Sequence, residues 1–340
     1  YNHLVDAYAA LTRGTTKPAA AEVITLLRDS SGGGIGSDAD TNMNYVIDFG
    51  GHTYTVGAPA VGSTGTVSQG LRVLKTSTAK FTNGTLKAAD YNGLVQVVHT
   101  YGDVTFENFN VDARENSYAQ IAVEPDCGTL NITGNSSILA REGMTGLYVA
   151  FWHTATYDGT TVNVNTTGKI TGKLVYEFDE DMTGNDVATE NKAVLNIANG
   201  NFEITGIQTL FSGVANEALK EAKIEVSGGT FSTDVKEYLA EGKILQKNGD
   251  TYTAVTNSGI TSGTYTSEPT VPSGYKATKN DDGTWTVSKV SYYYYQPTTD
   301  TKTTDTKGSP KTFDAGIALY VGMALTSAAG VAFVGKKRED

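Results

Sequence analysis

A short β-run that reaches a glycine or asparagine, bends and then resumes recurs seven times between residues 45 and 232 of this chain, as in VTFENFNVDA (104–113) and LNIANGNFEITG (195–206). The seven bends fall at Gly50, Gly84, Asn108, Gly134, Gly168, Gly200 and Gly228. Successive bends are spaced by roughly 30 residues, and a period of this size is typical of a solenoid or an array. Each repeat is long enough for three short strands.

The residues within one repeat alternate as a strand requires. Val104 and Phe106 point one way, and Thr105 and Glu107 point the other way. Glycine and asparagine suit the bends because they tolerate positive φ. Repeats of this kind stack so that each strand pairs with the same strand of the next repeat. We therefore predict an all-β fold, a right-handed parallel β-helix, over residues 21–232.

An up-and-down barrel or a sandwich is the alternative all-β fold. Either one would favour tight hairpin turns that recur at short and regular intervals, and few such turns are visible in this region.

The chain on either side of the predicted solenoid lacks the repeat. Residues 21–27, AEVITLL, open it as a predicted buried strand, and NHLVDAYAAL before them has helical spacing. Two modules with turns at Asn248-Gly249 and Asp282-Gly283 would close it. The predicted segments are an N-terminal helical cap (1–20), the β-helix (21–232), a closing helix-hairpin module (233–257), a small β module (258–291), a disordered Thr-rich linker (292–308) and a terminal signal (309–340).

Charge and cysteine content narrow the function classes. The formal net charge is −11 and no basic stripe precedes the tail, so we expect no binding to nucleic acid. Cys127 is the only cysteine, which rules out an internal disulfide. Its setting, EPDCGTLNI, resembles a turn that leads into a strand, where a small buried residue is expected more than a catalytic thiol.

The C-terminal segment 309–340 has three parts in a fixed order. The motif SPKTFD (309–314) comes first, and an uninterrupted apolar run (317–334) follows. Such a run spans about 27 Å as a helix, which is barely the thickness of a bilayer core. Lys336, Lys337 and Arg338, within a basic tail (336–340), would retain this helix on the cytoplasmic side. A permanent tail anchor is the alternative to a transient insertion into the membrane.

This three-part tail resembles the cell-wall sorting signal of Gram-positive surface proteins, in the Ser-Pro-X-Thr form seen in clostridia. The resemblance implies that a sortase reads Ser309, Pro310, Lys311 and Thr312, cleaves after Thr312 and joins it to peptidoglycan or its precursor. Phe313 stands where the usual motif has glycine. The body, with phrases such as GGTFSTDVKEYLAEG and GYKATKNDDGTWTV, resembles β-helical surface proteins of gut clostridia. The resemblance implies a secreted protein attached covalently to the cell wall.

Two groups of side chains are candidates for ligand contact. Tyr148, Trp152 and Tyr157 could stack on sugar faces, although a core or capping role for Trp152 is the alternative. The acidic loop with Asp179, Asp181 and Asp186 offers carboxylates to calcium, although a solvated loop is the alternative. The four histidines have no metal-ligand spacing in the sequence, so we expect them to be structural or surface residues. We predict no catalytic residue and no cofactor.

These features favour a non-enzymatic, adhesin-like surface protein that displays a β-helix to a host or glycan ligand. One alternative is a wall-attached polysaccharide lyase or glycoside hydrolase, which would need carboxylates and a basic residue grouped in a groove. Another is a structural spacer for an upstream domain.

Overall fold

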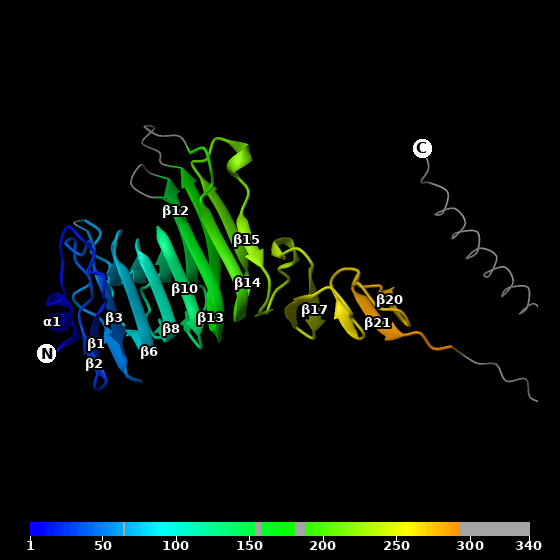
Figure 1. Ribbon diagram of the computed structural model, residues 1–340, viewed down its shortest axis with the longest axis horizontal. Coiled ribbons are helices and arrows are strands. Elements are labelled where there is room, and N and C mark those ends of the chain that lie inside the picture. Colours follow the sequence, from blue (N-terminus) through cyan, green and yellow to red (C-terminus); the bar gives the residue numbers. More distant parts are fainter. Residues whose placement is uncertain (64, 154–157, 181–187, 293–340) are drawn as a thin grey trace, which may run out of the picture. The chain divides into compact units, whose positions relative to one another are not determined.

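The computed structural model describes residues 1–63, 65–153, 158–180 and 188–292. All of its strands lie in one compact unit, Tyr1–Val290, and the rest of the chain forms a second unit, Ser291–Asp340. The first unit is all-β, as predicted: its one α-helix among the described residues, α1 (Leu4–Ala9), has six residues. Strands follow one another side by side along the unit (Figure 1).

Parallel pairing dominates the unit, in three series of strands. The first series runs β1 (Glu22–Thr25), β3 (Asn44–Asp48), β6 (Thr78–Ala88), β8 (Asp103–Asp112), β10 (Gly128–Gly134), β13 (Thr160–Glu180), β14 (Ala193–Ser212) and β15 (Lys223–Val226). The second runs β2 (Ser30–Gly32), β4 (Thr53–Val56), the later parts of β6 and β8, β11 (Ser137–Leu139), the middle of β13 and β14, and β16 (Thr230–Phe231).

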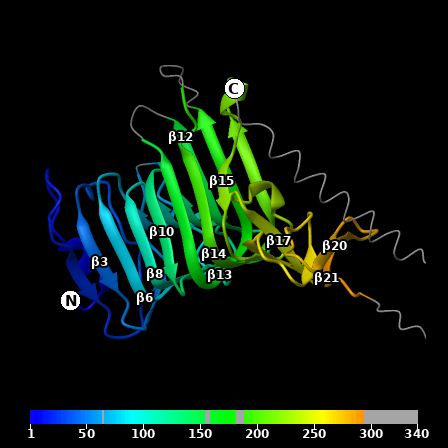
Figure 2. The ribbon, with the colours of Figure 1, turned by 45° about the vertical axis from the view of Figure 1, so that its right-hand side comes forward.

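The third series carries the candidate site. It runs β5 (Gln69–Val73), β7 (Gln96–Thr100), β9 (Ile121–Pro125), β12 (Thr145–His153) and the last parts of β13 and β14. The long strands β13 and β14 thus contribute to all three series, and their array stands out when the unit is turned (Figure 2).

The core consists of register rows, in which the same position of successive parallel strands is apolar. Ile47, Phe81, Phe106 and Ile132 are paired one to the next, and all four are fully buried. The rings of Phe81 and Phe106 meet edge to face with centroids 6.1 Å apart. Burial of one such side chain contributes about 2–3 kcal/mol. Each added strand therefore extends the same hydrophobic column.

The structure refines the predicted bends. Gly50, Asn108, Gly134 and Gly200 have positive φ, as expected. At the bends predicted at Gly84 and Gly228, the positive φ belongs to the neighbouring residue instead, Asn83 (φ 57°) and Gly229 (φ 99°) respectively. The predicted glycines at these two bends and at residue 168 are required for space, because a Cβ there would lie 2.1–2.4 Å from a backbone oxygen of the preceding turn.

The predicted buried strand over residues 21–27 is only partly correct. Strand β1 forms, but Val23 is 64% exposed and Leu27, beyond its end, is 85% exposed. Val23 is exposed because it stands in register with Val46, Lys80 and Thr105, a row on the outer face of the sheet in which no member is buried.

The C-terminal part of the unit is antiparallel. It contains β17 (Lys243–Asn248), β18 (Thr251–Thr256), β19 (Gly263–Tyr265), β20 (Tyr275–Lys279) and β21 (Trp285–Lys289). Gly249 and Gly283 lie in the two expected turns with positive φ. The helix expected near residue 236 is only a 3-10 turn, Lys236–Tyr238, and a second such turn spans Glu217–Leu219.

No helix among the described residues is both long and apolar enough to cross a membrane. The apolar run 317–334 lies outside those residues, as do the linker from residue 293 onward and the motif SPKTFD.

A pair of glycine substitutions tests how tightly the turns of this stack approach one another. Gly128 has φ +75°, and a Cβ there would lie 2.6 Å from the Gly102 oxygen. Gly143 has φ +79°, and a Cβ there would meet no heavy atom within 4 Å, so it is the matched control. We expect Gly143→Ala to lower the free energy of unfolding by about 1 kcal/mol through φ alone. Gly128→Ala should lower it by about 3 kcal/mol or more.

Urea denaturation of the two variants measures the difference. Equal losses would show that the turns at residues 102 and 128 are not in close contact.

Candidate functional site

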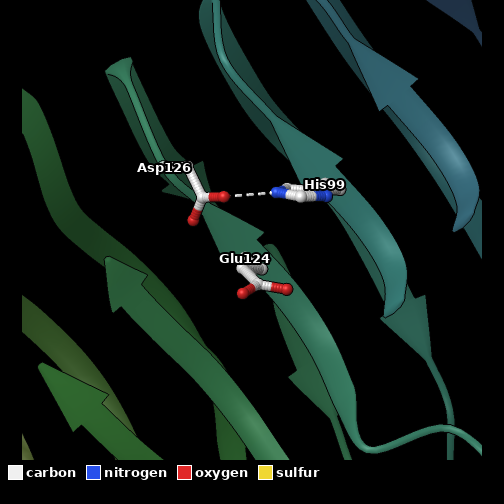
Figure 3. A group of neighbouring side chains, drawn as sticks. All are labelled: His99, Glu124 and Asp126. Atoms are coloured by element: carbon white, nitrogen blue, oxygen red, sulfur yellow. Dashed lines mark hydrogen bonds and ion pairs between the residues drawn. The ribbon is translucent and has the colours of Figure 1, made fainter. Parts of the chain in front are cut away.

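A histidine and two carboxylates meet at the ends of β7 and β9. His99 pairs in register with Glu124, and Asp126 directly follows the end of β9. The neighbour of His99 in β7, Val98, is a buried core residue, so alternation along the strand turns His99 to the opposite face of the sheet. Glu124 and Asp126 are two positions apart and lie on that same side. Figure 3 shows the three side chains grouped over the two strands.

The cluster is closed to solvent. His99 is 5% exposed, Glu124 4% and Asp126 1%. The Nε2–H of His99 donates to Asp126 Oδ2 at 2.5 Å, the dashed line in Figure 3. On the other side of the ring, the amide of Gln69 lies 2.7 Å from His99 Nδ1 and donates to it. The ring of Tyr101 packs against the imidazole with centroids 4.5 Å apart.

Burial and like charge act together on Glu124. Its pKa rises from 4.5 to about 7, first because the carboxylate is desolvated and second because Asp126 is close. Glu177 raises this pKa further, whereas His99 and the amide of Gln96 lower it. Glu124 Oε2 and Asp126 Oδ1 are buried and accept no hydrogen bond from any described residue. The cluster therefore has more acceptors than donors.

The nearest arginine in the same row is engaged elsewhere. Arg72 pairs in register with His99, but its guanidinium binds Asp38 Oδ1 at 2.7 Å and Ser63 Oγ at 2.6 Å. The Arg72 guanidinium is thus paired with Asp38 and also lies over the Tyr101 ring, 6.0 Å from its centroid.

A hollow of about 580 Å³ lies next to the cluster. The hollow extends across several neighbouring turns of the chain. Each of these turns connects a strand segment of the third series to the following strand segment of the first series. Its lining includes Lys75, Tyr101, Cys127, Lys192 and Lys223. We call this hollow the corner groove. Tyr101 and Cys127 adjoin the cluster in sequence, so the groove and the cluster share the same turns.

Charged pairs and glycines shape the corner groove. Lys75 is 3.7 Å from Asp158, and Lys223 is 3.1 Å from Glu190. Lys192 is exposed on the turn between them. The glycines at residues 102, 128 and 159 allow neighbouring turns to approach closely, because a Cβ at each would lie 2.6–2.9 Å from an atom of the adjacent turn.

Of the three aromatic side chains expected to contact a sugar, the structure describes only that of Tyr148. The Tyr148 hydroxyl donates to Glu177 on β13, and Ser212 Oγ donates to the other oxygen of the same carboxylate. Trp152 belongs to β12 but its side chain is outside the described part, and Tyr157 is outside it altogether.

The calcium candidates remain an expectation. Asp179 lies near the end of β13 and is partly buried, whereas Asp181 and Asp186 lie outside the described residues. The sorting-motif residues 309–313 and the basic residues 336–338 are outside them as well. Cys127 is buried between β9 and β10, as predicted.

Sequence reasoning missed the grouping of His99 with Glu124 and Asp126. The alternating Glu-Pro-Asp of residues 124–126 at a strand end was a usable signal, because it places two carboxylates on one side. The distance along the chain from His99 to Glu124 is another, since it is about one repeat. The sequence separation alone, however, does not show that the two residues touch; the pairing register of β7 with β9 does.

The raised pKa of Glu124 predicts a loss of stability with rising pH. Below pH 4.5 Glu124 is protonated in both the folded and unfolded states. Between pH 4.5 and about 7 the unfolded state releases this proton while the folded state keeps it, so the free energy of unfolding falls. The fall amounts to at most about 3 kcal/mol. Glu124→Gln should remove this fall and make the protein more stable than wild type above pH 7.

Urea denaturation at several pH values, in buffer with EDTA, measures this effect. Glu241→Gln, at an exposed position, is the control and should follow wild type. A Glu124→Gln profile that runs parallel to wild type from pH 4.5 to 7 would contradict the prediction.

No known protein family matches this chain, and no curated protein or solved structure is significantly similar to it. The function must therefore be argued from the chain's own residues: the closed cluster, the corner groove beside it and the sequence of the tail.

Proposed function

We propose that this chain is a wall-anchored, adhesin-like surface protein whose body is a right-handed parallel β-helix and whose corner groove binds an extended acidic glycan. The observation that carries the proposal is the corner groove, which crosses successive parallel turns and has lysines along its length.

Three parallel series support the β-helical body. In a β-helix, each coil contributes one strand segment to the first series, one to the second and one to the third. Each segment then pairs in parallel with the equivalent segment of the preceding coil. The order β6, β7, β8, β9, β10 follows this course, since β6 pairs with β8, β8 with β10, and β7 with β9. The bends with positive φ at Gly50, Asn108 and Gly134 fit the corners of such coils.

The spacing of the groove suits an extended polymer. Neighbouring strands in a sheet are about 4.8 Å apart, so equivalent side chains on successive turns recur at about that distance. This distance is comparable to the length of one sugar unit in an extended chain. A linear glycan lying along the groove would therefore meet one turn of the protein per sugar.

The groove presents three ammonium groups that can bind a negatively charged ligand, beside three carboxylates of its own, Asp103, Asp158 and Glu190. Lys75, Lys192 and Lys223 lie along it, and Tyr101 offers an aromatic ring at the same turns. Asp158 and Glu190 each bind one of these lysines and hold its ammonium group at the groove. Carboxylate groups of an acidic glycan would accept hydrogen bonds from the ammonium groups.

The carboxylates that the structure brings together favour binding over hydrolysis. A glycosidase needs an acid and a base that reach the substrate. Glu124 and Asp126 are at most 4% exposed, so a sugar in the groove does not reach them. Of the carboxylates that do line the groove, Asp158 and Glu190 are engaged with lysines, and Asp103 accepts a hydrogen bond from the Thr129 N–H.

The tail supplies the argument for the wall. SPKTFD, the apolar run and the terminal basic residues stand in the order of a sorting signal. The proposed partners are thus a sortase and peptidoglycan or its precursor, with transient insertion of residues 317–334 into the membrane. The Thr-rich linker 292–308 would carry the body away from the wall.

A glycan array probed with the chain ending at residue 290 tests the groove. This segment contains all described strands and both hydrophobic clusters, so we expect it to fold alone. We expect it to bind acidic glycans, and expect a variant with Lys192→Glu and Lys223→Glu to bind them roughly tenfold more weakly, because each exposed charge contributes about 1 kcal/mol or less.

The matched control is Lys276→Glu, at an exposed position on β20 outside the groove, which should bind like wild type. Release of reducing sugar by the same segment would contradict the binding proposal and favour the enzyme. If the segment neither binds a glycan nor releases sugar, the result would favour a structural spacer for an upstream domain.

Mass spectrometry of cell-wall digests tests the anchor. In a sortase-bearing Gram-positive host we expect a C-terminal peptide that ends at Thr312 and carries a peptidoglycan fragment. Thr312→Ala should move most of the protein from the wall fraction to the membrane and the medium, whereas Thr306→Ala in the linker should leave it in the wall. Mature wild-type protein that still contains residues beyond Thr312 would contradict the proposal.

A further inference from the structure

We propose that His99, Glu124 and Asp126 bind one divalent transition-metal ion of the zinc class, which cross-links β7 and β9 beneath the corner groove. This site can be present whether or not the groove binds a glycan and whether or not the chain is attached to a wall.

Geometry is the first argument. One ligand atom from each of the three residues lies within 4.8 Å of the other two. Zinc bonds to imidazole nitrogen and carboxylate oxygen are about 2.0–2.2 Å long, so ligand atoms around one ion are roughly 3–3.5 Å apart. Side-chain rotations that separate His99 Nε2 from Asp126 and draw Glu124 closer would produce that arrangement.

The orphaned oxygens are the second argument. Glu124 Oε2 and Asp126 Oδ1 belong to side chains more than nine-tenths buried, and neither accepts a hydrogen bond from a described residue. A buried polar atom without a partner costs about 1–3 kcal/mol, and more when it is charged. A cation between the two carboxylates would satisfy both oxygens and neutralise both charges.

No protein cation occupies this role among the described residues. Arg72, the nearest in the register row, is bound to Asp38 and Ser63. The further carboxylate of Glu177 adds negative charge close to Glu124. The site therefore combines a surplus of acidic groups with low solvent access, and a bound cation would offset the cost of that uncompensated buried charge.

Gln69 acts as the residue that orients the histidine. Its amide meets His99 Nδ1 at 2.7 Å, and its own Oε1 is buried without a hydrogen-bond partner. A half-turn of the amide group places Oε1 against Nδ1, which then carries the proton and donates to it. His99 Nε2 is left with a lone pair for the metal, the arrangement typical of histidine ligands.

The donor set selects the class of metal. One imidazole nitrogen and two carboxylates suit Zn²⁺ and its first-row neighbours. Ca²⁺ and Mg²⁺ prefer oxygen ligands only, so a histidine in the set disfavours both.

Metal analysis of the purified full-length chain in mild detergent tests the site. After incubation with Zn²⁺ and dialysis, we expect about one equivalent of zinc per chain by inductively coupled plasma mass spectrometry. Excess Zn²⁺ should raise the midpoint of thermal unfolding of EDTA-treated protein by roughly 5–10 °C, because the ion binds only the folded state. The same concentration of Ca²⁺ should have no such effect.

Variants assign the ligands. His99→Gln and Asp126→Asn should each bind zinc at least tenfold more weakly. His52→Gln is the control, because His52 is a partly exposed histidine beside Asp29 and should leave binding unchanged. Co²⁺ bound to wild type should give visible absorption bands that both ligand variants lack.

The proposal is overturned if wild type retains no zinc after dialysis and Zn²⁺ leaves its unfolding midpoint unchanged. It is also overturned if Ca²⁺ stabilises the protein and Zn²⁺ does not, or if both ligand variants bind zinc like wild type. Should a variant fail to fold, the wild-type stoichiometry and cobalt spectrum still decide.

Discussion

Parallel register is the constraint on which the rest of this structure depends. Each interior strand of the three series forms hydrogen bonds with the strand one repeat before it and the strand one repeat after it, so every position along the strand belongs to a row. An apolar row such as Ile47, Phe81, Phe106 and Ile132 becomes a buried column. On the other face, the same pairing holds the polar side chains of one row next to one another at the distance between neighbouring strands.

The row of Arg72, His99 and Glu124 shows what this concentration does to charge. In an isolated strand each of these side chains would be solvated. Stacked, they bring a histidine and, through Asp126, two carboxylates into a space closed to water, and the pKa of Glu124 rises accordingly. Because desolvated charge of one sign destabilises a fold, a neutralising ion would turn an unfavourable cluster into a cross-link.

The sequence predicted what depends on local pattern. Alternation, the repeat and the turn pairs Asn248-Gly249 and Asp282-Gly283 led to an all-β chain with two hairpins, and several bends have the expected positive φ. The sequence did not predict the features that depend on which residues pair between neighbouring strands. Because the step along the chain from Arg72 to His99 is longer than the step from His99 to Glu124, no fixed period aligns the three. The exposure of Val23 likewise depends on register, because Val23 stands in the outward-facing row of Val46, Lys80 and Thr105.

The corner that follows β7 and β9 links the two proposed sites. Its glycines at residues 102, 128 and 159 let successive turns approach closely, and the same turns line the groove. Tyr101 packs on His99 and also lines the groove, so any shift of the imidazole moves a ring that a bound sugar would meet. A metal ion held by His99 would fix that ring in one position. The ion would thereby reduce the entropy lost when a glycan binds, without touching the glycan itself.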